Sequence, residues 1–407
     1  MGKGKKTRDL ILGTALEVFR ERRYGNSSVN EIAKRLGVRT SLVYYYFANK
    51  EDIFNELAVT YRDGLEEEIR QHISFEGSLL QNVINILVTY KDYIRSHKDL
   101  YDTFREVEFV EKDLIRDYYQ RITHLIAQVL PTDFSKLYDL ETLAFAILGS
   151  VYFVVIKNLI WENKEDIDQE LETVKVFLDK GIDIDGTFTP FIVPENPMES
   201  QEPQFASRGE RTKYQLLKAG EKLFGEKGFE KTQLTEITSE AGVGLGTFYL
   251  YFESKTELLA EIVKYVNHTL RKTSRIYQDA LTDRRTIENV GFQAFYHLFK
   301  NMGPAYRIVR EAEFVEPSIG IWYYTRLAEG YTKGLAQAME SKQIRPMDPE
   351  VLAYILMGVS HTTGIKWFVL DECKEINDNS VLTVLELVMH GLSGMERKVT
   401  NELQRNL

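Results

Sequence analysis

A stretch of 26 residues occurs twice in this chain, and this repeat limits the fold more than any other feature of the sequence. Moving Val29–Phe54 forward by 205 residues places it on Leu234–Leu259 without a gap. Eight of the 26 positions are then identical, namely Glu31/Glu236, Ile32/Ile237, Gly37/Gly242, Val38/Val243, Tyr44/Tyr249, Tyr46/Tyr251, Phe47/Phe252 and Lys50/Lys255. In a chain of 407 residues, which exceeds one ordinary domain core, the repeat predicts two similar units.

Each copy of the repeat has the pattern of two short helices joined by a tight turn. In the first copy, Ser28 and Glu31 have the spacing of a capping box that begins a helix. Gly37 permits the positive φ that ends this helix, and Val43 packs a second helix against it. This arrangement is a helix-turn-helix, whose second helix can enter the major groove of DNA.

Further residues around the repeat complete a longer motif. The first copy contains Val18-Phe19, Tyr24, Ser27, Ile32-Ala33, Gly37-Val38, Tyr44, Tyr46-Phe47 and Lys50. The second copy contains Leu223-Phe224, Gly228-Phe229, Thr232, Ile237, Gly242-Val243, Tyr249, Tyr251-Phe252 and Lys255. On these residues, both copies resemble the DNA-binding region of the TetR family of transcriptional regulators.

The resemblance implies an all-α fold of two tandem TetR-like units. Each unit would have an N-terminal three-helix helix-turn-helix head and a helical body for ligand binding and dimerisation, and the two units would form an intrachain pseudo-dimer. The predicted boundaries are 1–55 for the first head, 56–182 for the first body, 183–209 for a linker, 210–260 for the second head and 261–407 for the second body.

The linker is predicted because the helical pattern stops at four prolines, Pro190, Pro194, Pro197 and Pro203. Beyond it, the last helices of the two bodies align only when the offset grows to 209, which implies a four-residue insertion near 341–347. The short basic segment 2–8 is expected to be a mobile arm.

Charge and cysteine content suit a DNA-binding protein of the cytoplasm. The net charge is −10, yet residues 1–50 hold eleven Lys or Arg against four Asp or Glu, so an acidic body carries a basic head. The single cysteine, Cys373, allows no intramolecular disulfide and no cysteine-based zinc site. The most apolar segment, 143–156, is too short to span a membrane and is expected to be a buried helix.

The resemblance implies contacts to DNA phosphates from each head. Tyr44 and Tyr249 would donate their hydroxyls, and Lys50 and Lys255 would follow at the start of the next helix. Ser27 and Thr232 would cap helices near the DNA backbone. Such contacts set the register on DNA and carry no base information.

Base reading is expected from the exposed positions of the two recognition helices, where the copies differ. The first copy offers Arg39, Thr40, Ser41 and Tyr45, and the second offers Gly244, Leu245, Gly246, Thr247 and Leu250. Arginine can bind guanine through two hydrogen bonds, whereas leucine offers only apolar contact. We therefore expect a protein that reads two unlike half-sites.

A second repeated motif lies outside the heads. Residues 101–121 match residues 306–326 at 10 of 21 positions. One interpretation is a charged brace between body helices that fixes the angle of the head. The other is an effector pocket, with candidate residues Arg105, Glu108, Tyr118, Arg121, Arg310, Glu313, Tyr323 and Arg326.

The apolar helices near the ends of the two bodies are interrupted by three residues in total that can carry a positive charge. They are Lys157 and Lys366 at matching positions and His361 in the second copy only. The lysines can reach the surface along their apolar stems, or they can meet an anionic ligand group. Together with the aromatic content of 12%, the cationic set would suit a fatty acid or an acyl-CoA.

These observations predict a ligand-responsive transcriptional regulator that binds double-stranded operator DNA, a repressor released by a small-molecule effector. The alternative is a constitutive or architectural DNA-binding protein without an effector. No nucleophile motif, phosphate loop or metal-ligand spacing is present, so we expect neither an enzyme nor a cofactor. The sequence leaves open whether two chains pair again.

Overall fold

The computed structural model describes residues 3–195, 205–278, 280–372 and 376–405. The chain is 78% helical, and the described residues contain no strand, which confirms the predicted all-α class. It divides into two compact units, Met1–Leu130 with Val155–Ile167 and Pro131–Val154 with Asp168–Leu407. Cys373 and residues 196–204 of the predicted linker lie outside the described residues.

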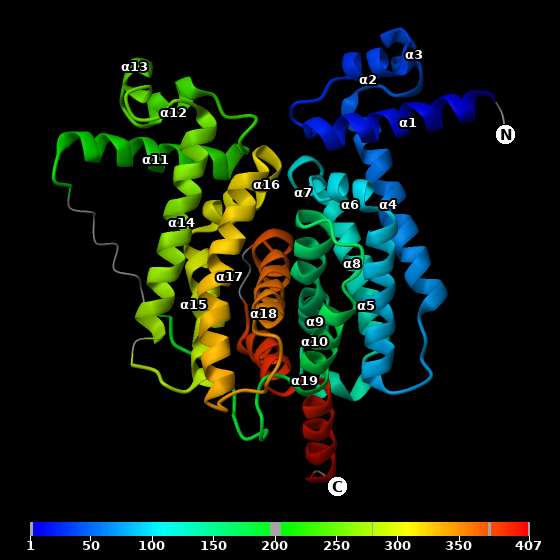
Figure 1. The fold of residues 1–407 in the computed structure, drawn as a ribbon, viewed down its shortest axis with the longest axis vertical. Coiled ribbons are helices and arrows are strands. Elements are labelled where there is room, and N and C mark those ends of the chain that lie inside the picture. The colour runs from blue at the N-terminus through cyan, green and yellow to red at the C-terminus, as the bar shows by residue number, and fades with distance from the viewer. Residues whose placement is uncertain (1–2, 196–204, 279, 373–375, 406–407) are drawn as a thin grey trace. The chain divides into compact units, whose positions relative to one another are not determined.

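The first head consists of three helices, α1 (Lys3–Arg22), α2 (Val29–Leu36) and α3 (Thr40–Tyr46) (Figure 1). Ser28 caps α2, since its side chain accepts a hydrogen bond from the Glu31 N–H at 3.2 Å, and Gly37 ends α2 with a φ of 71°. The expected mobile arm is wrong for residues 3–8, because α1 already begins at Lys3.

The rest of the first unit is a helical body. It contains α4 (Lys50–His72), α5 (Leu79–Ser96), α6 (Lys98–Phe104), α7 (Val107–Val110), α8 (Lys112–Gln128) and the π-helix η2 (Ile156–Trp161). Asn49 caps α4 by accepting from the Asp52 N–H at 2.8 Å. The buried face of α4 includes Leu57, Tyr61 and Leu65, whose helical spacing turns one stripe toward the body core.

The second unit repeats this order. Its head consists of α11 (Arg208–Lys227), α12 (Leu234–Glu240) and α13 (Leu245–Phe248), followed by α14 (Lys255–Gln278), α15 (Arg284–Asn301), α16 (Gly303–Val315) and α17 (Pro317–Glu340). Because α11 begins at Arg208, the first helix of this head includes the last two residues of the predicted linker.

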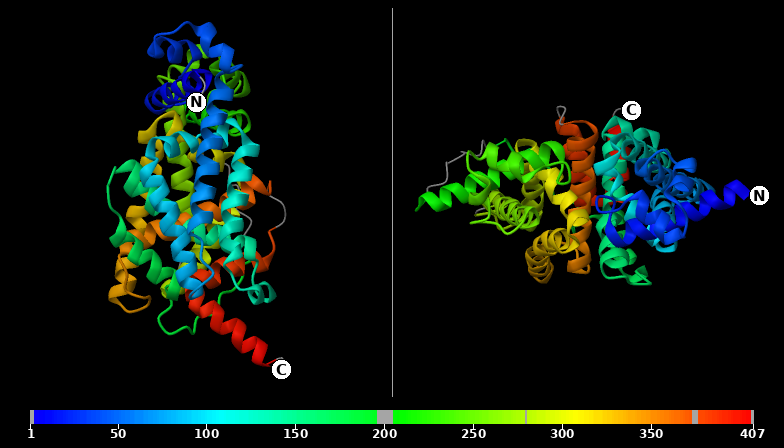
Figure 2. Two further views of the ribbon diagram at one scale, coloured as in Figure 1. Left: turned by 90° about the vertical axis from the view of Figure 1, so that its right-hand side faces the viewer. Right: turned by 90° about the horizontal axis from the view of Figure 1, so that it is seen from above.

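The remaining helices of the second unit come from both copies. They are η1 (Thr132–Lys136), α9 (Leu140–Val155), whose last residue belongs to the first unit, α10 (Asp168–Lys180), α18 (Pro349–Gly364), the π-helix η3 (Ile365–Leu370) and α19 (Asp378–Arg405). Helix α10 packs against α18 and α19 (Figures 1 and 2). The last helix of the first copy therefore packs on the last helices of the second copy.

Helices α9 and α18 cross at the two glycines that the sequence aligns. A Cβ atom added to Gly149 would lie 2.6 Å from the Gly358 carbonyl oxygen, and one added to Gly358 would meet the Gly149 carbonyl. Only hydrogen fits between the two backbones. Contact of each residue with its own counterpart is the signature of a two-fold interface, here formed within one chain.

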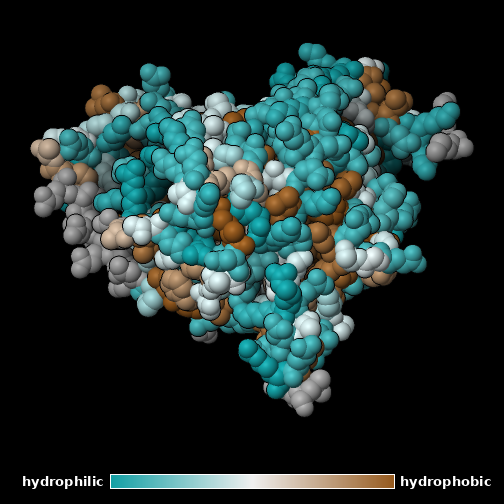
Figure 3. Space-filling view, turned by 60° about the horizontal axis from the view of Figure 1, so that its bottom comes forward, coloured by the Kyte–Doolittle hydropathy of each residue, from teal (hydrophilic) through white to brown (hydrophobic). Residues whose placement is uncertain are grey.

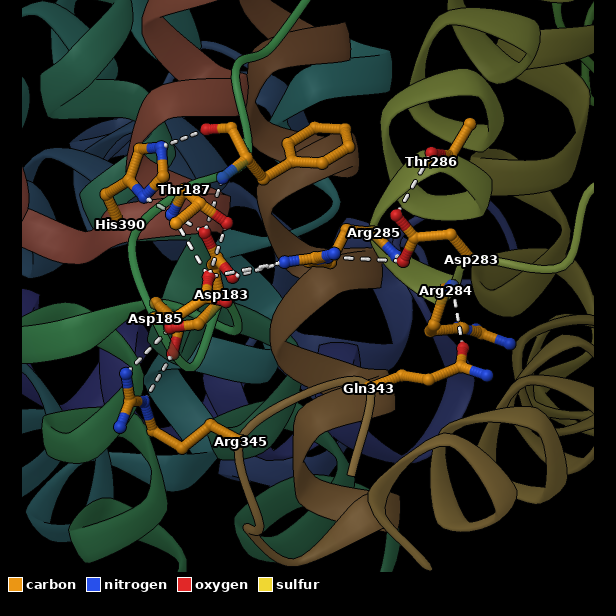
Figure 4. Close-up of polar contacts among 12 residues, drawn as sticks. Asp183, Asp185, Thr187, Asp283, Arg284, Arg285, Thr286, Gln343, Arg345 and His390 are labelled. Carbon is orange, nitrogen blue, oxygen red and sulfur yellow. Dashed lines mark hydrogen bonds and ion pairs between the residues drawn. The ribbon is translucent and has the colours of Figure 1, made fainter. Parts of the chain in front are cut away.

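A polar cluster fixes the start of the linker to the second body (Figure 4). The Asp183 carboxylate is buried and accepts hydrogen bonds from Arg285 Nη1 and from the Phe188 N–H, both at 2.9 Å. Arg345, in the loop where the insertion was predicted, donates from its backbone N–H to the Ile182 carbonyl at 2.8 Å. These hydrogen bonds therefore fix the first residues of the linker to the second body.

One helical segment, Leu140–Trp161, is long and apolar enough to cross a membrane by length and composition alone. However, 83% of its most apolar window is buried inside the protein, which is typical of a core helix. The face drawn in Figure 3 is largely hydrophilic, with hydrophobic side chains in separate patches.

Candidate DNA interface and effector cavity

The recognition helix of the first head presents most of its predicted contact residues to solvent. Arg39, Ser41, Tyr44 and Tyr45 are exposed, and Tyr45 is 80% exposed. Thr40 is half-buried, and its hydroxyl donates to the Asn30 side-chain oxygen at 2.9 Å. A large exposed tyrosine beside an arginine is suited to contact DNA bases and phosphates.

The recognition helix of the second head is shorter and more apolar. α13 spans only Leu245–Phe248, with Gly244 as its N-terminal cap residue. Leu245, Tyr249 and Leu250 are exposed, at 42%, 55% and 78%, and Thr247 is half-buried. The two heads therefore share an exposed tyrosine, Tyr44 or Tyr249, and differ in the side chains around it.

Lys50 and Lys255 have the same position in the two heads. Lys50 Nζ donates to the Tyr24 carbonyl at 2.6 Å and to the Ser27 carbonyl at 3.0 Å. Lys255 Nζ donates to the equivalent carbonyls of Phe229 and Thr232 at 2.8 and 3.0 Å. Each lysine thus holds the loop between the first two helices of its head, and desolvation lowers the pKa of Lys255.

Ser27 and Thr232 are not the helix caps that we expected. Ser28 and Gln233 hold those positions, one residue later in each copy. Ser27 Oγ donates to the Tyr24 carbonyl and Thr232 Oγ1 to the Gly228 carbonyl, both at 2.8 Å, and both side chains are buried. Each of these hydroxyls is hydrogen-bonded within its own loop. The N-cap position of the helix is therefore held by the next residue, Ser28 or Gln233.

A buried glutamate joins each head to its body, and the sequence analysis did not identify it. Glu106 accepts a hydrogen bond from the Tyr24 N–H at 2.9 Å. At the matching position of the second unit, Glu311 accepts from the Phe229 N–H at 3.0 Å. Both glutamates belong to the repeated segments 101–121 and 306–326, where the sequence Arg-Glu-x-Glu recurs at 105–108 and 310–313, and this recurrence was the available signal.

Burial shifts the pKa of the glutamate that joins each head to its body, a contact that we call the joint of the unit. Desolvation is the main cause that raises the pKa of Glu106 to about 8, although Arg23 opposes this effect from 3.7 Å. Arg23 also pairs with Asp102 at 2.7 Å. Desolvation likewise raises the pKa of Glu311, which Arg307 partly offsets from 3.5 Å. These contacts run from the motif to the head, whereas the first interpretation placed the charged brace between body helices.

A cavity of about 510 Å³ lies in the second body, within the range of roughly 300–1,000 Å³ that suits small ligands. Aliphatic and aromatic side chains from seven helices form much of its wall, namely Phe153, Leu270, Ile287, Phe292, Phe295, Val309, Leu327, Leu356, Val359, Leu385 and Val388. Phe153 belongs to α9, so the first copy contributes to a cavity of the second.

Three of the predicted ligand residues line this cavity. They are Tyr323, which is buried, Arg326, whose side chain is 48% exposed, and His361. His361 stacks on Tyr152 with a distance of 5.0 Å between ring centroids. Desolvation raises the pKa of Tyr323, so its hydroxyl stays protonated and can donate a hydrogen bond.

The other predicted ligand residues of the second copy do not line the cavity. Arg310 is buried, with Nε donating to the Tyr306 carbonyl at 3.0 Å, and desolvation lowers its pKa to about 10. Lys366 Nζ pairs with Glu141 at 3.0 Å and with Asp371 at 2.9 Å. Glu313 is buried and its backbone abuts Gly320.

Cationic side chains on α14 and α17 also line the cavity, and the sequence analysis missed most of them. Arg284 and the acidic residues Glu288 and Glu329 lie in the same lining. Arg271 and Arg275 lie one turn apart on α14, and Arg326 and Lys333 lie two turns apart on α17. Among the residues that the structure describes, none forms an ion pair with Arg271, Arg275 or Lys333. Helical spacing alone could have grouped them, but only the fold turns both faces toward one space.

The predicted ligand residues of the first copy are distributed differently. Arg121 pairs with Glu66 and with Asp117, both at 2.8 Å, and Lys157 pairs with Glu162 at 2.9 Å. Tyr118 is buried in an aromatic cluster, and Arg105 is buried with Asp102 at 3.4 Å. Glu108 is half-buried on α7.

Comparison with known proteins identifies the heads. The family model for bacterial regulatory proteins of the tetR family matches residues 11–57 and again residues 216–262. The regulator AcrR of Shigella flexneri is 28% identical over 148 residues, which cover 32% of this chain and 69% of that protein. The fatty acid metabolism regulator protein of Bacillus subtilis is 33% identical over 112 residues, covering 24% of this chain and 58% of that protein.

The sequence matches cover only part of the relatives. The Bacillus subtilis regulator YerO is 38% identical over 68 residues, which are 16% of this chain and 24% of that protein. Among solved structures, the fatty acid degradation regulator FadR of Bacillus halodurans is 18% identical with a TM-score of 0.41, covering 46% of this chain and 98% of that chain. FadR of Bacillus subtilis in complex with stearoyl-CoA is 20% identical with a TM-score of 0.39, covering 44% and 98%.

The evidence for identity is therefore the paired family match together with the two heads of the structure. Each matched range runs from the first helix of a head into the helix that follows it, α4 or α14. The spacing between the two ranges is the spacing of the internal repeat. This chain therefore carries two DNA-binding domains of the tetR family of bacterial regulatory proteins in tandem.

Proposed function

We propose that this protein is a cytoplasmic repressor that binds an operator with two unlike halves and is released from it by an amphipathic anion. The cavity of the second body is the observation that carries this proposal, because it joins an apolar wall to a cationic rim. Such a lining favours a ligand with an apolar chain and a negatively charged group, such as a fatty acid or an acyl-CoA.

The unlike operator halves follow from the two recognition helices. Exposed Arg39 in the first head can form two hydrogen bonds with a guanine, whereas exposed Leu245 in the second can contact a thymine methyl group. Further phosphate and base contacts would come from Tyr44 and Tyr249 and from the flanking residues Ser41 and Thr247. Lys50 and Lys255 would need to exchange an intradomain hydrogen bond for a phosphate contact.

Two helices connect the cavity to the second head. α14 lines the cavity through Leu270 and Arg271, and Lys255 at its N-terminus holds the loop of the head. α16 lines the cavity through Tyr306 and Val309, and its Glu311 bonds the same loop. A ligand that moves α14 relative to α16 would therefore change the position of this head, and operator affinity would fall.

The ligand class also agrees with the name of one relative, the fatty acid metabolism regulator protein of Bacillus subtilis. An effector would bind in the body rather than in the head. The match covers 112 residues, more than one head alone, and 58% of the relative. We therefore take fatty acids and acyl-CoAs as the first compounds to test.

The test begins with selection of binding sites from a random DNA duplex pool by the full-length chain. Fluorescence anisotropy then measures affinity for the selected duplex with and without lauroyl-CoA, with free CoA as the control. We expect the selected site to have unlike halves and lauroyl-CoA to weaken binding at least tenfold. Equal affinity in the presence of every tested amphipathic anion would favour the constitutive DNA-binding protein instead, and a doubled site would mean that two chains pair.

A further inference from the structure

We infer that each chain takes one effector molecule, in the second body alone, and that the first body is a closed counterpart which does not sense the ligand. This inference rests on the proposed function and concerns its stoichiometry and the residues that decide it. It comes from comparing the lining of the cavity with the matching positions of the first unit, 205 residues earlier in the chain.

Aromatic rings fill the matching space of the first body. Tyr61 is fully buried, with its ring centroid 4.7 Å from that of Phe104 and 5.4 Å from that of Tyr101. In the second unit, Val266 and Val309 occupy the positions of Tyr61 and Phe104. Val309 lines the cavity, so loss of the second ring at this position opens space that the first body uses for packing.

The polar residues at matching positions of the two bodies differ in charge, since the acidic Glu66 of the first body is replaced by Arg271 in the second. In the first body, Arg121 is balanced by Glu66 and Asp117. The residues at these three positions in the second unit are Arg326, Arg271 and Trp322. A closed ion-pair network therefore becomes a pair of arginines without either acidic partner.

The second body is left with a positive charge that has too few partners of its own. Arg326 pairs with Glu329 at 2.6 Å at the protein surface. Arg271 Nε is buried without a hydrogen-bond partner among the described residues. A buried donor of this kind is costly, and an anionic group bound beside it would satisfy it and relieve the repulsion between the arginines.

The interface helices carry the same asymmetry. Phe153 of α9 reaches into the cavity, where its ring lies 4.6 Å from that of Tyr324 and 4.8 Å from that of His361. The counterpart of Phe153 on α18 is Thr362, whose hydroxyl donates to the Phe145 carbonyl at 2.7 Å. The position that matches Phe153 in the second copy therefore holds a hydroxyl side chain and no ring.

Two consequences follow for regulation. Ligand binding saturates with one site per chain, and it acts directly on the second head through α14 and α16. The first head keeps its own joint through Glu106, so the ligand-bound protein retains affinity for the half-site that contains the base contact of Arg39.

The experiment is isothermal titration calorimetry of the full-length chain with lauroyl-CoA and, in a separate arm, with laurate. The two arms distinguish an acyl-CoA from a free fatty acid as the preferred anion. We expect one binding site per chain in at least one arm. Arg271→Glu should weaken that binding at least tenfold, whereas Lys272→Glu, the same charge change on an exposed neighbour, should change it less than twofold.

The outcomes separate this inference from the proposed function. Two sites of similar affinity per chain would overturn the inference and leave a ligand-responsive repressor in place. One site that survives Arg271→Glu and is lost in Glu66→Arg would also overturn it, because the ligand would then lie in the first body. Absence of binding in both arms would overturn the proposed effector and the inference together. Circular dichroism and thermal unfolding of each variant would confirm that it is folded.

Discussion

The two units of this chain agree where a head is joined to its body and differ where the protein would meet other molecules. Glu106 and Glu311 bond the same loop of their heads, and Lys50 and Lys255 hold the same carbonyls. The recognition helices and the interiors of the bodies have diverged. The comparison teaches that the two copies share the contacts between head and body and differ in the surfaces that we propose for DNA and ligand.

The largest predicted effect is at the crossing where the two copies pack on each other. Gly149→Val should lower the free energy of unfolding of the second unit by about 3 kcal/mol, because the new side chain must displace the α18 backbone near Gly358. Urea denaturation would measure this change. The control is Gly13→Val, where an added Cβ meets nothing within 4 Å and only helix propensity is lost.

The next effect sharpens the contrast between the heads. Arg39→Ala should weaken binding to the selected operator by about 2 kcal/mol and relax base preference in one half only. Leu245→Ala should cost less, about 1 kcal/mol, because it removes only apolar contact. Anisotropy with duplexes altered in one half at a time would distinguish them. Equal losses at both halves from either variant would contradict the assignment of one head to each half.

A pH dependence would test the joint of the first unit. The pKa of Glu106 is raised by burial to about 8, so the folded protein binds this proton more tightly than the unfolded chain, whose carboxyl group has the ordinary value of 4.5. The stabilisation from this group is therefore fully present below pH 4.5 and is lost as the pH rises to about 8.

Unfolding free energy should accordingly fall by about 1 kcal/mol from pH 6.5 to pH 7.5 through Glu106 alone. Glu106→Gln should remove this part of the pH dependence, and Glu111→Gln, at the less buried end of the same motif, should leave it. Denaturation at several pH values provides the measurement. An unchanged slope in Glu106→Gln would show that the carboxyl group does not titrate in this window.

The smallest effect concerns the tyrosines that the heads share. Tyr44→Phe and Tyr249→Phe should each weaken operator binding by about 0.5–1.5 kcal/mol, since each removes one hydrogen bond to a phosphate. The loss should be similar for all DNA sequences. A change in base preference, read by competition among duplexes, would instead place these hydroxyls on bases.

Much of the candidate site could be predicted, because local sequence patterns carry it. The exposed positions of α3 follow from the helix-turn-helix pattern, and the exposed residue after α13, Tyr249, follows from the repeat. Tyr323 and Arg326 were named from their repeated motif and line the cavity. In contrast, the hydrogen bonds of Lys50 to the Tyr24 and Ser27 carbonyls depend on the geometry of the loop, which no pattern encodes.

The sequence by itself determined the two heads, the helical character of each body, the break at the linker and, through the offset of 209, the alignment of Gly149 with Gly358. All of these depend on periodicity or on comparison of one copy with the other. Only the tertiary structure decided that Glu106 and Glu311 join head to body, and that Arg271, Arg326 and Phe153 border one cavity. Such contacts unite segments more than fifty residues apart, where pairing depends on how helices pack rather than on local composition.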